Sequence, residues 1–225
     1  MCTVSYIPVD TGFILTSNRD ENPSRETSAP QKIQLDTGEE LTAPVDLENK
    51  GTWIAVSNKN RVACLLNGAF IKHERKLPYR MSRGQIVLDS FRSKSFTDFI
   101  NDIDLHNIEP FTLVLADETK LQVLIWDGSE KHHQNLDINK THLWSSSTLY
   151  TREVHNDKLT FFNNFIEKSD LKPESILELH GLNYDNIFIL NKEQVKTVSI
   201  TQTVINKITK VAELTYNLKR ESIEV

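Results

Sequence analysis

The sequence predicts an α+β fold, a four-layer αββα sandwich in which two β-sheets lie between two layers of helices. Two observations predict it: apolar runs that come in hairpin-like pairs, and helical segments between these pairs that do not form a regular strand–helix–strand repeat. The chain has 225 residues, 38% of them hydrophobic and 25% charged, with a formal net charge of −5. Because a chain of this length can bury a sizeable core, we expect a single domain over residues 1–225.

The first expected element is a β-hairpin at the start of the chain. Residues 3–8 and 11–17 have the pattern of strands, and Val9-Asp10-Thr11-Gly12 supplies the turn between them. Residues 22–50 contain three prolines and many polar side chains. We therefore expect an irregular segment there, with one short strand at 32–35.

The rest of the chain alternates between strand and helix patterns. A second hairpin is expected at 52–57 and 61–66, where β-branched and apolar runs suit buried strands. Apolar spacing then predicts a helix at 82–92, with Ser82 as its N-cap. The remaining expected elements are a helix at 96–103, strands at 111–116 and 121–126, helices at 151–168 and 174–179, and strands at 197–206 and 211–218.

Composition argues against several classes of protein. The acidic chain has no basic stripe for nucleic acid, and no apolar stretch approaches the ~20 residues of a membrane-spanning helix. The start of the chain lacks a signal-peptide pattern, and only two cysteines occur, so we expect reduced thiols and a cytoplasmic location. We predict no metal site, since the adjacent His132 and His133 would point to opposite faces of a strand.

Cys2 directly follows the initiator methionine. If Met1 is removed, as the small Cys2 side chain should permit, one residue carries both a thiol nucleophile and an α-amino group that can act as its base. The reference pKa is ~8 for the amine and ~8.5 for the thiol, so a neighbouring cation could produce thiolate near neutral pH. The alternative is that Cys2 is a small buried side chain of the first strand.

A polar cluster ends the predicted hairpin, with the sequence Ser17-Asn18-Arg19-Asp20-Glu21. In an antiparallel pair the end of the second strand lies opposite the start of the first, so we expect Cys2 beside Asn18, Arg19 and Asp20. Arg19 offers a permanent positive charge to a thiolate, and Asp20 could hold the new α-ammonium group. The alternative is a structural ion pair that closes the hairpin.

Asn67 ends the strand predicted at 61–66 and is a candidate oxyanion donor, a role that could contribute roughly 3 kcal/mol to transition-state stabilisation. Asn67-Gly68 could instead form a turn. Trp53 and Cys64 have the alternative role of core side chains.

Several motifs together resemble the NRDE family, of the transport and Golgi organisation protein 2 type, over nearly the whole chain. The Asn18-Arg19-Asp20-Glu21 block gives this family its name. The other motifs are Met1-Cys2-Thr3, Gly51-Thr52-Trp53, Leu65-Leu66-Asn67, Trp144-Ser145-Ser146-Ser147 and Thr197-Val198-Ser199. Residues 66–84 look like a bacterial branch of the family.

The NRDE family is in turn similar to the N-terminal nucleophile hydrolases, the αββα class that includes bile salt hydrolases and penicillin V acylases. In those acylases a cysteine attacks an amide carbonyl, an arginine and an aspartate activate it, and an asparagine stabilises the oxyanion. By position, the resemblance assigns these roles to Cys2, Arg19, Asp20 and Asn67. The chain departs from the pattern at the second asparagine of the acylases, where it has hydroxyl residues around Ser146, and Arg152 is not a convincing match to their late arginine.

The segment from His73 to Arg83 is rich in basic and aromatic side chains, which would suit an anionic ligand beside the predicted site, or would simply form a solvated loop. Family members have been associated with haem trafficking and with acyl-CoA or lipid metabolism. The resemblance therefore implies two alternatives for this chain. One is a cysteine hydrolase or transferase for a non-peptide amide or thioester that requires no cofactor. The other is a non-catalytic carrier with haem or acyl-CoA as ligand.

The expected partner is accordingly an anionic small molecule, such as acyl-CoA, haem or an acyl amide. The sequence leaves its identity and the oligomeric state open. The candidate binding residues are Asn18, Glu21, Trp53, His73, Tyr79, Arg80, Arg83 and Ser146.

Overall fold

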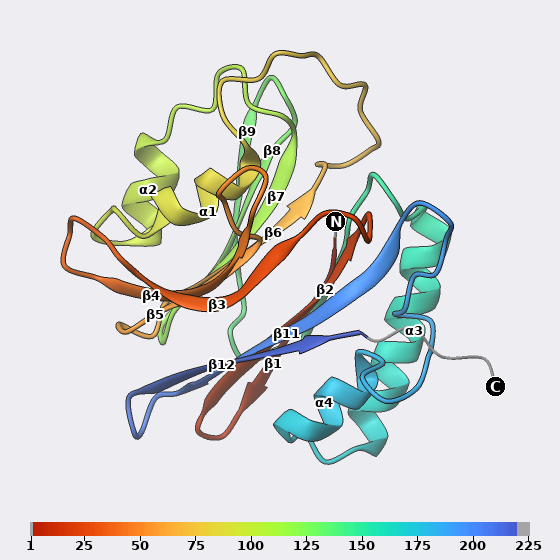
Figure 1. Ribbon diagram of the computed structural model, residues 1–225. Coiled ribbons are helices and arrows are strands. Elements are labelled where there is room, and N and C mark those ends of the chain that lie inside the picture. The colour runs from red at the N-terminus through yellow and green to blue at the C-terminus, as the bar shows by residue number, and fades with distance from the viewer. Residues whose placement is uncertain (1, 220–225) are drawn as a thin grey trace.

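A computed structural model describes residues 2–219 and contains two antiparallel β-sheets packed face to face between helices (Figure 1). The first sheet has the strand order β10-β1-β2-β11-β12. Its members are β1 (Cys2–Val9), β2 (Gly12–Glu21), β10 (His142–Ser145), β11 (Lys196–Asn206) and β12 (Val211–Leu218).

The second sheet follows the order of the chain, from β3 to β9. Its strands are β3 (Thr27–Gln34), β4 (Glu40–Asp46), β5 (Ile54–Ser57), β6 (Val62–Asn67), β7 (Phe111–Ala116), β8 (Leu121–Trp126) and β9 (Lys131–Leu136). The continuous apolar runs of β7 and β8 make them strands buried on both faces.

Two pairs of helices form the outer layers (Figure 1). They are α1 (Arg83–Ser90) and α2 (Phe96–Asp102) on the second sheet, and α3 (Arg152–Lys168) and α4 (Pro173–Leu179) on the first. The side chains of Ser95 and Thr151 cap α2 and α3, respectively, whereas Ser82 stands at the start of α1 without a side-chain cap bond.

Three apolar clusters hold the four layers together. One joins α1 and α2 to the second sheet through residues such as Phe91 and Phe96, and one fills the space between the two sheets. The third joins α3 and α4 to the first sheet and includes Phe162 and Phe188. The prediction of an αββα sandwich is confirmed.

Residues 22–50 are more regular than predicted. They form β3 and β4, where we expected an irregular segment with one short strand. Pro30 lies in β3 at an irregularity of the register between Ser28 and Gln31, and β3 ends the strand order of its sheet. An edge strand with a register shift can accept a proline because the missing N–H breaks no ladder hydrogen bond.

Other elements also differ from the prediction. Strand β2 continues to Glu21, so the polar cluster at 17–21 belongs to the strand and does not follow it. Strands β9 and β10 were not predicted, because their short polar sequences lack an apolar alternation.

No helix within residues 2–219 has the length and apolar character needed to cross a membrane.

Candidate functional site

Cys2 begins β1 and lies directly opposite Arg19 of β2 in the antiparallel register. The predicted adjacency of these two residues is therefore confirmed. The Cys2 side chain is fully buried in the apolar cluster between the two sheets, a cluster that also contains Cys64. This burial describes the chain that still carries Met1, and the expected removal of Met1 concerns a residue outside the described range.

Ser146 connects Cys2 to the end of β6. Its backbone N–H donates to the Cys2 carbonyl at 2.9 Å, and its Oγ donates to the Asn67 carbonyl at 2.6 Å. Ser146 is 1% exposed, so both bonds are shielded from water. Through this serine the structure brings the main chains of Cys2 and Asn67 together.

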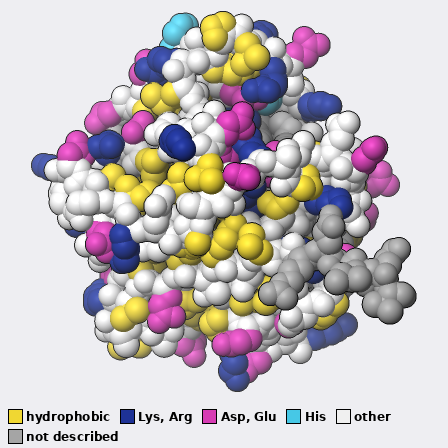
Figure 2. Space-filling model, in the orientation of Figure 1, with side chains coloured by type: hydrophobic (Ala, Val, Ile, Leu, Met, Phe, Trp, Pro, Cys, Tyr) yellow, Lys and Arg dark blue, Asp and Glu magenta, His cyan; other side chains and the backbone are white. Residues whose placement is uncertain are grey.

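A cleft of about 430 Å³ opens between the two sheets and the loop of residues 68–82. Figure 2 shows a hollow in the upper half of this face with basic and acidic side chains around it. Four arginines and three carboxylates are among its described lining residues, which gives the cleft one net positive charge in an acidic protein. These charged residues are Arg19, Arg25, Arg75, Arg83, Glu21, Asp46 and Glu109.

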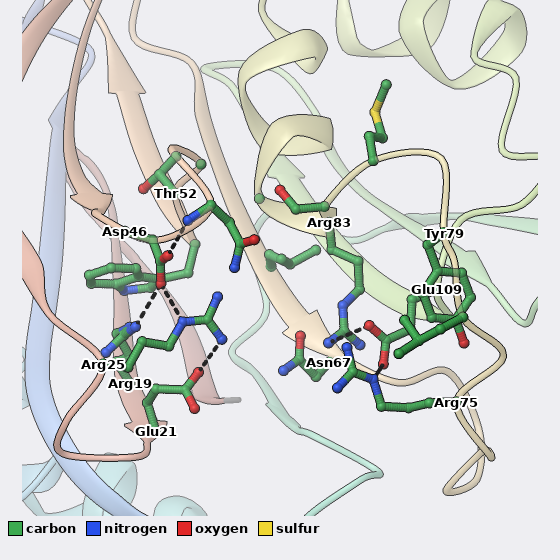
Figure 3. A pocket seen from close by; sticks show the side chains of 18 of the residues that line it. Arg19, Glu21, Arg25, Asp46, Thr52, Asn67, Arg75, Tyr79, Arg83 and Glu109 are labelled. Atoms are coloured by element: carbon green, nitrogen blue, oxygen red, sulfur yellow. Dashed lines mark hydrogen bonds and ion pairs between the residues drawn. The ribbon is translucent and has the colours of Figure 1, made fainter.

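One wall of the cleft is built on β2 and β4 (Figure 3). Arg19 is 3% exposed, donates through Nη2 to Asp46 Oδ2 at 3.1 Å, and lies over the Trp53 ring at 4.6 Å. Arg25 approaches the same Asp46 oxygen at 2.7 Å and Glu21 at 3.2 Å. Burial opposes ionisation of Asp46, but the Asn49 amide and the two guanidinium groups lower its pKa below the ordinary value.

The opposite wall is formed by Glu109 and two arginines (Figure 3). Arg83, at the start of α1, lies 3.2 Å from Glu109 and donates to the Pro110 carbonyl at 3.0 Å. Arg75 approaches Glu109 at 3.4 Å and is largely exposed. Burial lowers the pKa of Arg83 to about 10, and Glu109 partly opposes this effect. Arg83 therefore remains a cation at neutral pH.

Asn67 stands between the two walls (Figure 3). Tyr79 lines the cleft, and its hydroxyl accepts the Lys76 N–H at 2.8 Å. His73 and Arg80 are not among the lining residues. His73 lies 3.2 Å from Glu109, and Arg80 pairs with exposed Asp104.

Two members of the NRDE block face away from the cleft. Asp20 accepts hydrogen bonds at 2.6 Å from Thr197 Oγ1 and from the Tyr150 hydroxyl, on the side of the first sheet covered by helices. Asn18 is fully buried there and bonds the His180 carbonyl at 2.9 Å. Neither side chain lines the cleft. This corrects the expectation that Asn18 and Asp20 lie beside the Cys2 side chain, because neighbours along a strand alternate between its faces.

The sequence analysis missed Asp46, Arg25 and Glu109, which complete the two walls. Asp46 and Glu109 fix the arginines, and Arg25 shares Asp46 with Arg19. Asp46 ends a strand within the segment that we expected to be irregular, so nothing in the local pattern singled it out. Within residues 2–219, no three or more histidine, cysteine, aspartate or glutamate side chains come together as a metal site would require.

The fold defines a structural class. Three solved structures with this architecture are N-acylethanolamine-hydrolysing acid amidase from Caenorhabditis elegans, conjugated bile acid hydrolase from Clostridium perfringens (C2A mutant) and penicillin V acylase from Agrobacterium tumefaciens. Their TM-scores are 0.62, 0.57 and 0.52 at 12%, 11% and 9% identity. The alignments cover 90%, 97% and 95% of this chain and 92%, 92% and 82% of the respective structures. The chain thus has the N-terminal nucleophile hydrolase fold.

The family follows from the sequence. The profile of the family described as Transport and Golgi organisation 2 matches residues 1–222, and the chain belongs to that family. No curated protein matches the sequence at a significant level.

Proposed function

We propose that this protein is a cysteine N-terminal nucleophile hydrolase or transferase that acts on an amide or thioester of an anionic small molecule. The observation that carries the proposal is the position of Cys2 opposite Arg19 and, through Ser146, close to the main chain of Asn67. Arg19 and Asn67 both line the cleft, and the fold is shared with acyl hydrolases. The reaction begins once Met1 is removed and Cys2 becomes the first residue.

In the proposed reaction the α-amino group of Cys2 takes the thiol proton and the sulfur attacks the acyl carbonyl. Arg19 stabilises the thiolate by its charge, and the Asn67 carboxamide donates to the oxyanion of the tetrahedral intermediate. The amine or thiol leaving group then departs with the proton. Water, or a second nucleophile in the transferase reaction, attacks the resulting thioester and restores Cys2.

The experiment combines intact-mass analysis with an electrophilic amide or thioester probe. We expect loss of Met1, one acyl adduct at Cys2, and no adduct in Cys2→Ser. Cys64→Ser is the matched control, because Cys64 is equally buried in the same cluster and burial raises its pKa far above the ordinary value. Asn67→Ala should slow acylation about 100-fold. Retention of Met1, or labelling that persists in Cys2→Ser, would contradict the proposal.

A second candidate function is non-catalytic binding of haem or acyl-CoA in the same cleft. Two observations favour it: the Cys2 side chain is not among the lining residues of the cleft, and arginines stand on both walls. A saturable absorbance change on titration with haem, or a calorimetric isotherm with acyl-CoA, would support it. Arg83→Gln should then weaken binding while Arg80→Gln, outside the cleft, should not. Failure of both ligands to bind would remove this candidate.

A further inference from the structure

A buried charged network lies behind the two strands that carry Cys2 and Arg19. Thr3 follows Cys2, Asp20 follows Arg19, and both side chains face α3. Asp20 and Lys158 are each 0% exposed. Buried carboxylates and ammonium groups are costly unless they are compensated, so this arrangement calls for an explanation.

Lys158 is held tightly in this network. Its Nζ donates to Thr3 Oγ1 at 2.7 Å and lies 3.3 Å from the centre of the Tyr150 ring. The Tyr150 hydroxyl in turn donates to Asp20 at 2.6 Å. Tyr150 therefore touches both charged residues, and its ring and hydroxyl link the ammonium group to the carboxylate.

Lys158 supplies positive charge to Asp20 on this side of the sheet. The other titratable groups on this side are Tyr150 before α3, His155 of α3 and His180 after α4, and the Cys2 thiol, on the other face of β1, is close enough to affect Tyr150 by its charge. Burial, reinforced by the Lys158 charge, lowers the pKa of His180 to about 3, so this ring is neutral. Burial also lowers the pKa of Lys158, to about 8, while Asp20 opposes the change.

Burial raises the pKa of Asp20, and the hydroxyl groups of Thr197 and Tyr150, together with Lys158, oppose that rise. The Thr197 and Tyr150 hydroxyl groups donate their hydrogen bonds directly to Asp20 oxygens, and Lys158 is not a partner in either bond. The ammonium group is thus the component of the network whose removal changes the electrostatics without removing a bond to Asp20.

We propose that Lys158 is a positioning residue that keeps Asp20 ionised behind the nucleophile, so that this carboxylate can hold the α-amino group of Cys2 after Met1 is removed. The link to the α-amino group rests on the proposed function. The link between Lys158 and Asp20 rests on the contacts above and stands independently of turnover. Lys158 acts through Asp20 and does not contact the acyl group.

The test compares Lys158→Met with Lys168→Met, an exposed lysine on the same helix. NMR of the ¹³C-labelled side-chain carboxyl of Asp20 follows its titration. We expect its midpoint to move up by one pH unit or more in Lys158→Met and to stay in place in Lys168→Met. An unchanged midpoint in Lys158→Met would overturn the proposal. If Lys158→Met does not fold, Asp20→Asn combined with Lys158→Met removes both charges and should fold; failure of the double variant also counts against the proposal.

A second readout separates this proposal from the proposed function. The rate of Cys2 acylation in Lys158→Met should show its acid limb displaced upward with Asp20, about a tenfold loss of rate per pH unit on that limb. If wild-type Cys2 is not acylated at all, the proposed function fails while the Asp20 titration still decides the role of Lys158. If acylation occurs with an unshifted limb, the positioning role fails and the proposed function stands.

Discussion

Two buried arginines, Arg19 and Arg61, show how the two sheets of this protein differ. Arg61 precedes β6 of the second sheet, is 7% exposed, and donates to Glu39 at 3.0 Å and 2.6 Å and to the carbonyls of Ser93 and Phe91. Arg19 of the first sheet is 3% exposed, yet it donates only to Asp46, and its Nη1 has no partner within the described residues.

The two arginines differ in how many of their N–H donors are bonded. Arg61 has the bonding of a structural arginine, whereas Arg19 has unused capacity, that is, an N–H donor without a partner within the described residues. A guanidinium group offers five N–H donors, and a protein that needs it only for stability tends to satisfy them. Arg61 ties β6 to the segment after α1 and stacks near Phe91 and Phe96. Arg19 stands opposite Cys2 with a free donor, which is the state expected of a group that awaits a thiolate or a ligand.

The largest expected effect comes from Arg61→Met. This change leaves Glu39 as a buried carboxylate that retains only Ser57 and the exposed Lys59 as partners, and it removes the bonds to two carbonyls. Breaking a buried pair in this way typically destabilises a protein by about 3–5 kcal/mol. Urea unfolding followed by fluorescence measures the loss. Glu39→Gln with Arg61→Met, which removes both charges, should recover part of it; a loss below about 1 kcal/mol in Arg61→Met would break the comparison.

Arg19→Met should destabilise the protein less than Arg61→Met does, and it should lower the rate of Cys2 acylation more. Asp46 keeps its bonds to Arg25 and the Asn49 amide when Arg19 is replaced, so we expect a loss of about 1–2 kcal/mol. Acylation of Cys2 should fall sharply at neutral pH because the thiol loses its neighbouring cation. Paired unfolding and labelling measurements on Arg19→Met and Arg61→Met would then give opposite rankings. The same ranking in both assays would show that Arg19 is only structural.

The contrast between the two arginines also explains what sequence could and could not predict. The juxtaposition of Cys2 and Arg19 follows from the hairpin alone, and the apolar runs at 111–116 and 121–126 coincide with β7 and β8. The bonding of each arginine depends on Asp46 and Glu39, which come from β4 and the turn before it. The prolines in residues 22–50 predicted an irregular segment there, so the local sequence did not indicate that Glu39 and Asp46 are the partners of the two arginines.

The position of Asp20 on the face of β2 opposite to Arg19 could have been predicted from the sequence, because side chains alternate along a strand. A period of two places Asp20 opposite in direction to Arg19, where it meets Tyr150 and Thr197. The sequence also indicates that Lys158 is buried, since it lies four residues before Phe162 on the same side of α3. A lysine on the apolar stripe of a helix requires a buried partner, but only the fold shows which residue that is.

Acid should lower the free energy of unfolding through Glu39 and Asp46, the carboxylate partners of the two arginines. In Glu39 and Asp46 burial opposes ionisation, but hydrogen bonds and guanidinium groups outweigh it and lower the pKa below the ordinary values of 4.5 and 3.8. Carboxylates with lowered pKa contribute stability that is present above these values and is lost as pH falls through the lower folded ones. Unfolding free energies measured from pH 6 downward should therefore decline below about pH 4. The decline should be smaller in Glu39→Gln; an identical decline would exclude Glu39 as its source.

The smallest expected effect, and the sharpest test of the unused capacity near Arg19, comes from Trp53→Phe. The Trp53 ring supports the Arg19 guanidinium at 4.6 Å, and its Nε1 has no partner within the described residues. Phenylalanine keeps an aromatic face under the cation and removes an N–H that is not bonded, so the free energy of unfolding should change by only about 1 kcal/mol or less. Thermal and urea unfolding would measure this. A loss above about 2 kcal/mol would mean that the indole N–H is bonded in solution, and the surroundings of Arg19 would then be as fully satisfied as those of Arg61.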